Sequence, residues 1–111
     1  MDISLDAFPQ TGGTTTCEAL WMGVPVVAKR GPAVFERLSY SVLMNAGLGD
    51  LCAETTEDYV AIALKLAADP ERIGELRRGM RARLRASPLG DTQQFAADYF
   101  ATIEKAVKGE I

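Results

Sequence analysis

Two glycines followed by three threonines, at positions 12 to 16, form the stretch of this chain whose residue types could do chemistry. A glycine loop that opens a helix leaves the first helical N–H groups without acceptors, and the helix dipole adds positive potential at the same place. Such a helix start binds anions, most often a phosphate. Glu18 lies one turn further on and is an acidic residue of the kind that holds a ribose diol. The stretch therefore predicts a site for a phosphorylated ligand.

The same stretch also has a purely structural explanation. Glu18 follows Thr15 by three residues, which is the spacing of a capping box, so Thr15 is a better N-cap than Thr14 by local rules. In that interpretation the glycines form a tight turn, the threonines cap a helix, and Glu18 closes the box. For Glu18, local chemistry favours a role in the capping box over a role in ribose binding. For the glycine loop, it leaves both an anion site and a purely structural turn open.

The flanking sequence supplies the elements that would position this loop. Residues 2–8 and 24–28 are short apolar runs typical of strands, and the second is rich in β-branched residues, as in a strand buried on both faces of a parallel sheet. Strand, glycine loop, helix and strand is the order of an α/β fold, which binds ligands at the carboxyl ends of its strands. Lys29 lies at the carboxyl end of the second strand. Its side chain is either solvated or neutralises a diphosphate. Trp21 stands between two apolar residues and is predicted to lie in the core.

Helical periodicity accounts for most of the remaining chain. It predicts helices over residues 33–46, 55–67, 70–86 and 91–108, and a short third strand within 48–53. Arginines surround an apolar stripe in the 70–86 helix, which favours a solvated amphipathic helix over a phosphate-binding face. The predicted fold is α/β, with about three short parallel strands and four to five helices in one domain over residues 1–111.

Composition and charge exclude several classes of protein. The net charge of −3 provides no basic face, so we expect no nucleic-acid partner. The chain lacks histidine, the commonest general base near neutral pH, and its cysteines Cys17 and Cys52 are isolated, so we expect neither a metal nor a cofactor. No apolar run reaches the roughly 20 residues that span a bilayer, and no signal peptide is recognisable, so we expect no membrane partner and a cytoplasmic location.

The sequence resembles the C-terminal catalytic part of the O-linked N-acetylglucosamine transferases, above all their bacterial relatives that are linked to TPR repeats, a group similar to the SPINDLY proteins. The motifs that carry the resemblance are Asp6-Ala7-Phe8-Pro9, residues 12–27, Arg37 and Ser41 ahead of Gly47-Leu48, and Ser87-Pro88-Leu89. They extend over nearly the whole chain. The run from Glu18 to Val27 is the most specific of them, because general α/β patterning does not produce it.

The resemblance implies a glycosyltransferase of the GT-B class, which has two Rossmann-like domains, and places this chain in the C-terminal half of the second. It implies a UDP-sugar donor with its diphosphate at Gly13, Thr14 and Thr15 and its ribose at Glu18. It further implies transfer of N-acetylglucosamine, or a related sugar, to serine or threonine of a protein acceptor, without a metal. The family often has histidine at the position of Gly13 and aspartate at that of Glu18.

The resemblance also implies that the chain is a fragment of a longer protein. The other Rossmann-like domain, the first half of this one, the TPR repeats and the family's candidate base have no counterpart here. We therefore expect the chain alone to be inactive and to self-associate, edge to edge or by exchange of helices. Two alternatives stay open: a nucleotide-sugar enzyme of the same architecture, such as a 2-epimerase, and an α/β interaction module that has lost its ligand, which glycine at position 13 favours.

Overall fold

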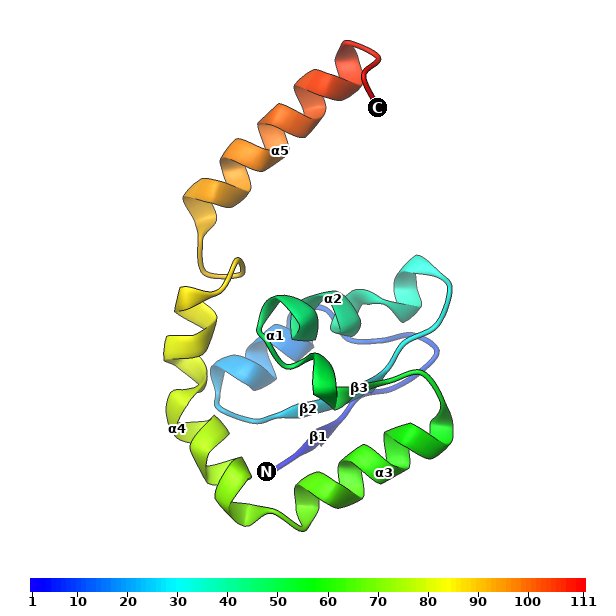
Figure 1. Ribbon diagram of the computed structural model, residues 1–111, viewed down its shortest axis with the longest axis vertical. Helices are drawn as coiled ribbons and strands as arrows, with labels where there is room; N and C mark the ends of the chain where they lie inside the picture. The colour runs from blue at the N-terminus through cyan, green and yellow to red at the C-terminus, as the bar shows by residue number, and fades with distance from the viewer.

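The computed structural model describes residues 1–111 and contains a three-stranded parallel sheet with helices on both sides (Figure 1). The strands are β1 (Ser4–Leu5), β2 (Val26–Lys29) and β3 (Cys52–Ala53), in the spatial order β1-β2-β3. β1 pairs parallel with β2, with Ser4 opposite Val26 and Leu5 opposite Val27. β2 pairs parallel with β3, with Ala28 opposite Cys52 and Lys29 opposite Ala53, so all strands end at the same edge. The predicted α/β class with three short parallel strands is confirmed.

Five α-helices and two 3-10 turns complete the chain. They are α1 (Thr14–Trp21), η1 (Val34–Glu36), α2 (Leu38–Asn45), η2 (Gly49–Leu51), α3 (Thr56–Ala67), α4 (Pro70–Ala86) and α5 (Thr92–Val107). α1 and α2 lie on one side of the strands and α3 on the other, while α4 runs along the side of this body (Figure 1). The prediction of a single helix over residues 33–46 is wrong for the first part of this range. Arg37 has a non-helical backbone there, with φ −122° and ψ 3°, and separates η1 from α2.

The core is built around β2. Val26, Val27 and Ala28 are each at most 2% exposed, which confirms the prediction of a strand buried on both faces. Leu20 of α1 and Met80 of α4 are completely buried against this cluster. α1 and β2 are therefore fixed relative to one another by apolar packing, and the loop that precedes α1 is held at the edge of a rigid body.

α5 projects away from the body, with no buried residue (Figure 1). The molecule measures 51 × 30 × 18 Å, and its radius of gyration is 15.5 Å. A compact domain of this size has a radius of gyration of roughly 13 Å, so the excess reflects the extended helix. None of the helices combines the length and apolar character that crossing a membrane requires.

Candidate functional site

α1 begins without a side-chain cap. Its N-cap is Gly13, with φ −124° and ψ −84°, and Thr14 is the first helical residue. The predicted capping box of Thr15 and Glu18 is wrong, because the helix starts two residues earlier than a Thr15 cap implies and places Thr15 inside its first turn. The backbone N–H groups of Gly13, Thr14 and Thr15 have no acceptor within the chain. By contrast, α3, α4 and α5 are capped by the side chains of Thr55, Asp69 and Asp91.

Buried hydroxyl groups hold the loop before α1 from the inside. The Ser39 hydroxyl donates to the carbonyl oxygen of Gly12 at 2.8 Å, and it accepts from the Thr16 hydroxyl at 2.7 Å. The Thr11 hydroxyl donates to the carbonyl oxygen of Phe35, also at 2.8 Å. Thr11, Thr16 and Ser39 are at most 4% exposed. These three side chains anchor the loop. The sequence alone assigns no role to Thr11 or Ser39, and it indicates Thr16 only as part of the threonine run.

A groove of about 380 Å³ runs along the exposed face of α1. It is lined by Thr14, Cys17, Glu18 and Trp21 of α1, by Val42 of α2, and by Leu84, Arg85, Leu89 and Gly90 at and beyond the end of α4. The four α1 residues are spaced at i, i+3, i+4 and i+7 and so share one side of the helix. The structure therefore brings two predicted site residues, Thr14 and Glu18, into one groove. Gly13 and the exposed Thr15 stand at the start of the helix and do not line it.

Trp21 belongs to this groove and not to the core, so its predicted burial is wrong. Its neighbour Leu20 takes the core position and is fully buried, while Trp21 is 39% exposed. The guanidinium groups of Arg81 and Arg85 lie 5.0 and 5.3 Å from the centroid of the indole ring, within the range of cation–π attraction. Arg81 also donates from Nε to the carbonyl oxygen of Trp21 at 2.9 Å.

Arg85 is a candidate that sequence reasoning missed. It lines the same groove as Thr14 and Glu18, and it adds a positive charge to a surface that is otherwise largely apolar. The sequence feature that could have pointed to Arg85 is the high density of arginine in α4. An amphipathic helix carries charged residues on all its exposed positions, however, so the pattern alone cannot indicate which arginine reaches α1.

Lys29 lies away from the groove. Its Nζ atom donates to the Thr56 hydroxyl at 3.1 Å and stands 4.7 Å from the centroid of the Phe8 ring. The neighbouring Arg30 forms an ion pair with Glu54 and stacks on Tyr40. Both basic residues thus hold the loops at the carboxyl edge of the sheet together, and neither contacts the start of α1.

Asp6 connects β1 to the glycine loop. Its Oδ1 atom accepts a hydrogen bond from the N–H of Gly12 at 3.0 Å, and its carbonyl oxygen accepts one from the Tyr59 hydroxyl at 3.0 Å. Burial and, to a smaller extent, the negative charge of Asp6 raise the pKa of Tyr59 above its ordinary value. The other carboxylate oxygen, Oδ2, is buried and has no partner. No group of three or more histidine, cysteine or acidic side chains lies close enough to hold a metal ion.

A parallel sheet whose first strand leads through a glycine loop into a helix, with a groove beside that helix, defines an α/β protein of the Rossmann-like class. The model of Glycosyl transferase family 41 matches residues 1–99, and the chain belongs to this family. The family resemblance noted from the sequence is therefore confirmed.

Relatives of the chain carry transferase names. A probable UDP-N-acetylglucosamine–peptide N-acetylglucosaminyltransferase SPINDLY of Hordeum vulgare is 46% identical over 86% of the chain, which spans 10% of that protein. A UDP-N-acetylglucosamine–peptide N-acetylglucosaminyltransferase of Caenorhabditis elegans is 31% identical over 87% of the chain, which spans 8% of it.

A solved structure supports the fold. A mutant of the O-GlcNAc transferase of Thermobaculum terrenum superposes with a TM-score of 0.78 and 39% identity, covering 96% of this chain. The chain corresponds to 20% of that protein. The fold is therefore the C-terminal half of a Rossmann-like domain of the GT-B type, and the chain represents a small part of the length of its relatives.

Proposed function

We propose that this chain is the donor-binding portion of a glycosyltransferase that moves N-acetylglucosamine, or a related sugar, from a UDP-sugar to serine or threonine of a protein acceptor. The observation that carries the proposal is the uncapped start of α1 beside a groove that contains Glu18. The names of the barley and nematode relatives, which specify UDP-N-acetylglucosamine and a peptide, support this choice of donor and acceptor.

In this proposal the diphosphate lies at the start of α1. The free N–H groups of Gly13, Thr14 and Thr15 donate to its oxygens, the helix dipole adds attraction, and Arg85 supplies positive charge from the side of the groove. Glu18 lies about 6 Å further along the helix axis, because each residue rises 1.5 Å. Its two carboxylate oxygens can accept from both hydroxyls of a ribose, which fixes the nucleoside relative to the diphosphate.

We assign no catalytic residue to this chain and propose that alone it binds the donor without transferring the sugar. Sugar transfer needs a group that accepts the proton of the attacking hydroxyl, and a surface that closes the donor site against water. The groove is lined by α1, α2 and the segment at and beyond the end of α4, and its one carboxylate, Glu18, is assigned to the ribose in this proposal. The chain also spans only 10% of the barley relative, in keeping with a partial site.

Calorimetric titration with UDP tests the donor site. We expect the wild-type chain to bind UDP and Glu18→Gln to bind it about tenfold more weakly, since one carboxylate contact to hydroxyls is lost. Glu57→Gln is the matched control, because Glu57 is an exposed acidic residue in the first turn of α3, away from the groove. ADP and GDP, titrated in parallel, test the choice of base.

Two results would reject the donor site. One is the absence of both binding heat and thermal stabilisation at saturating UDP. That result would favour the alternative function, an α/β interaction module that has lost its ligand. The other is equal affinity of the wild type and Glu18→Gln for UDP while both proteins remain equally stable. Tighter binding of GDP than of UDP would instead reject the proposed donor and retain the site.

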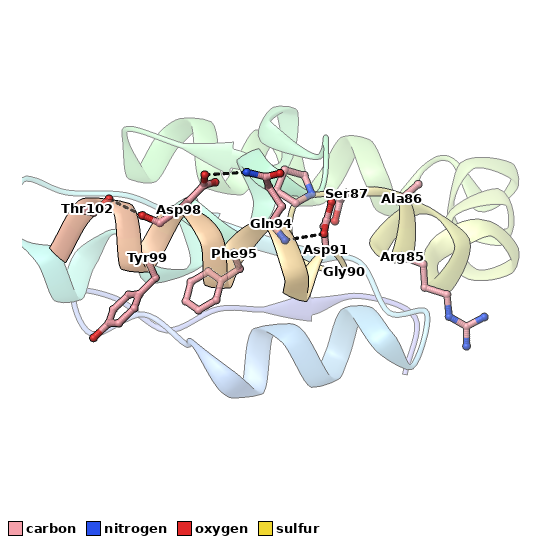
Figure 2. A pocket seen from close by; sticks show the side chains of 11 residues that line it. Arg85, Ala86, Ser87, Gly90, Asp91, Gln94, Phe95, Asp98, Tyr99 and Thr102 are labelled. Atoms are coloured by element: carbon pink, nitrogen blue, oxygen red, sulfur yellow. Dashed lines mark hydrogen bonds between the residues drawn. The ribbon is translucent and has the colours of Figure 1, made fainter. Parts of the chain in front are cut away.

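We further propose that the chain self-associates by pairing of α5 with α5 of a second copy. Side chains on this helix expose an apolar stripe: Phe95, Tyr99, Phe100, Ile103 and Val107 are 46–83% exposed. Figure 2 shows Phe95 and Tyr99 on one side of the helix and Asp98 on the other. The stripe offers about 500 Å² of apolar side chain per copy. Two copies together bury roughly 1,000 Å², near the lower limit for a specific interface.

The polar face of α5 lies opposite the stripe. At about 100° per residue, Asp98 and Lys105 are turned to the side of the helix away from Phe95, Tyr99 and Ile103. On that side, Asp98 accepts a hydrogen bond from Nε2 of Gln94 at 2.8 Å, and its carbonyl oxygen accepts one from the Thr102 hydroxyl at 2.7 Å. The proposed interface therefore consists of the apolar stripe, and the charged face stays in solvent.

A further inference from the structure

We propose that Asp6 is the positioning residue of the anion site, acting through Gly12 to aim the N–H groups at the start of α1 toward the ligand. The inference rests on the proposed donor site and adds a residue that does not touch the ligand. Its starting point is the buried and unpartnered carboxylate oxygen of Asp6, the one buried side-chain polar atom without a hydrogen bond in the structure.

Asp6 is fixed on three sides. Its backbone N–H donates to the carbonyl oxygen of Val27 at 2.9 Å, which holds it to β2. Its carbonyl oxygen accepts from the hydroxyl of Tyr59 at 3.0 Å, which holds it to α3. Its Oδ1 atom accepts from the N–H of Gly12 at 3.0 Å. Through these three hydrogen bonds, Asp6 fixes the glycine loop relative to β2 and α3.

Gly12 is held by both of its backbone polar groups. Its N–H binds Asp6, and its carbonyl oxygen points inward to the buried hydroxyl of Ser39 at 2.8 Å. In a planar trans peptide the N–H points opposite to the carbonyl. Since the carbonyl of Gly12 points into the protein, the N–H of Gly13 must point out of it. The two bonds at Gly12 thus set the direction of the first free donor of the site.

The loop follows a path that only glycine allows at position 12. A Cβ atom there would lie 2.5 Å from Oγ1 of Thr16, 2.8 Å from Oγ1 of Thr15 and 3.1 Å from Oδ1 of Asp6. This close approach brings the backbone within hydrogen-bonding distance of the carboxylate. Asp6 and Gly12 thus act as one unit.

The unpartnered oxygen of Asp6 indicates why the residue is charged. A buried carboxylate oxygen without a partner reduces stability, and native proteins contain few such atoms. A carboxylate, however, accepts a stronger hydrogen bond from a backbone N–H than a neutral group does. The charge therefore holds Gly12 more rigidly than an amide would, at a place where the fold alone gains nothing from Oδ2.

Asp6→Ala and Asp6→Asn, titrated with UDP, test the inference. We expect Asp6→Ala to bind UDP about tenfold more weakly, because the Gly12 N–H is released and the donors lose their common direction. Asp6→Asn keeps a weaker, neutral acceptor for Gly12, so we expect its affinity to lie between those of Asp6→Ala and the wild type. Asp69→Ala is the matched control: it removes an equivalent 3.0 Å bond from a backbone N–H to an aspartate Oδ1, at the start of α4.

Amide hydrogen exchange without ligand gives a second measurement. We expect the amide of Gly12 to exchange faster in Asp6→Ala than in the wild type or Asp69→Ala, and Asp6→Asn to restore part of its protection. If the wild type does not bind UDP, the proposed donor site fails, and the exchange data alone decide whether Asp6 orders the loop. Should Asp6→Ala not fold, Asp6→Ser takes its place, because the serine hydroxyl is too short to reach Gly12.

Three outcomes would overturn the inference. A folded Asp6→Ala variant could bind UDP as tightly as the wild type. Asp6→Asn could lose as much affinity as Asp6→Ala, which would mean that the bond to Gly12 is not what matters. The exchange rate of Gly12 could also be the same in all variants.

Discussion

Position 13 bears directly on the proposed donor site, because Gly13 is the N-cap of α1 and contributes no side chain there. A Cβ atom at Gly13 would have Leu38 Cδ1 as its nearest neighbour, at 3.9 Å, and φ of −124° suits any residue, so a side chain fits. We expect Gly13→His to bind UDP about tenfold more tightly at pH 6, where the imidazolium donates to the diphosphate, and to lose most of this gain at pH 8. Titration calorimetry at both pH values measures the effect.

Gly12→Ala is the contrasting control for that substitution. Here the new methyl group would lie 2.5 Å from Oγ1 of Thr16, so the loop must shift. We expect the free energy of unfolding in urea to fall by about 1–3 kcal/mol, as in other overpacked sites. Equal stability of Gly12→Ala and the wild type, or weaker UDP binding by Gly13→His at pH 6, would contradict this account of the two glycines.

Cys17 reports directly on the groove. It is exposed and lines the same surface as Thr14 and Glu18, so a nucleotide bound there covers its thiol. We expect saturating UDP to slow alkylation of Cys17 by iodoacetamide several-fold, as measured by mass spectrometry of the labelled peptides. Cys52 is the internal control: it lies outside the groove, and burial raises the pKa of its thiol, so it reacts slowly with or without UDP. Unchanged labelling of Cys17 would place the nucleotide elsewhere.

At the scale of elements, apolar patterning predicted most of the fold. The run Val24 to Ala28 gave the buried central strand because β-branched residues without polar interruption suit a two-sided parallel sheet. The helix ends were also predictable where a side chain caps them, as at Thr55 and Asp69. The start of α1 was not, because local rules reward a threonine cap, whereas the loop is held by the distant partners Asp6 and Ser39.

Contacts between elements account for the remaining errors at the site. Trp21 looks like a core residue in sequence because both its neighbours are apolar. Its place on α1 turns it toward α4, where Arg81 and Arg85 cover it. Glu18 and Arg85 come together in one groove although 66 residues separate them along the chain. Pairings of this kind depend on how α1 packs against α4, which periodicity does not determine.

The contact between α3 and the loop region predicts a dependence of stability on pH. Burial, and then the charge of Asp6, raise the pKa of Tyr59 in the folded protein above the value of about 10 in the unfolded chain. Because the folded state favours the protonated phenol, this contribution to stability is complete below about pH 10 and is lost as the pH rises through the raised pKa. We expect Tyr59→Phe, which cannot ionise, to show a smaller decline in the free energy of unfolding above pH 10 than the wild type.

Urea denaturation at pH 8, 10 and 11 measures this difference. The remaining titrating groups are the same in both proteins, so the difference between their free energies isolates Tyr59. Tyr59→Phe also loses the hydrogen bond to the carbonyl oxygen of Asp6, and we expect it to be about 1 kcal/mol less stable at pH 8. A constant difference between the two proteins across this pH range would contradict the role of Tyr59.

For the whole molecule, the two ends of the chain behave differently. The body up to α4 buries a continuous core, while α5 buries nothing and carries three aromatic side chains in contact with one another, Phe95, Tyr99 and Phe100. The largest surface depression, about 710 Å³, lies at the joint between α4 and α5 (Figure 2). The exposed apolar stripe of α5 is typical of an interaction surface. Pairing of α5 between two copies covers this face while the groove on α1 stays open.

A charge placed within the apolar stripe of α5 tests the pairing. Ile103→Asp places a carboxylate in the proposed interface, where it loses its hydration, so we expect the dimer to weaken at least about tenfold, with the dissociation constant measured by analytical ultracentrifugation. Asp98→Lys, on the polar face of the same helix, is the matched control that should change nothing. A monomeric wild type at micromolar concentration would refute self-association. A dimer that is indifferent to Ile103→Asp would refute the pairing of α5 and point instead to the open edges of the sheet, β1 and β3.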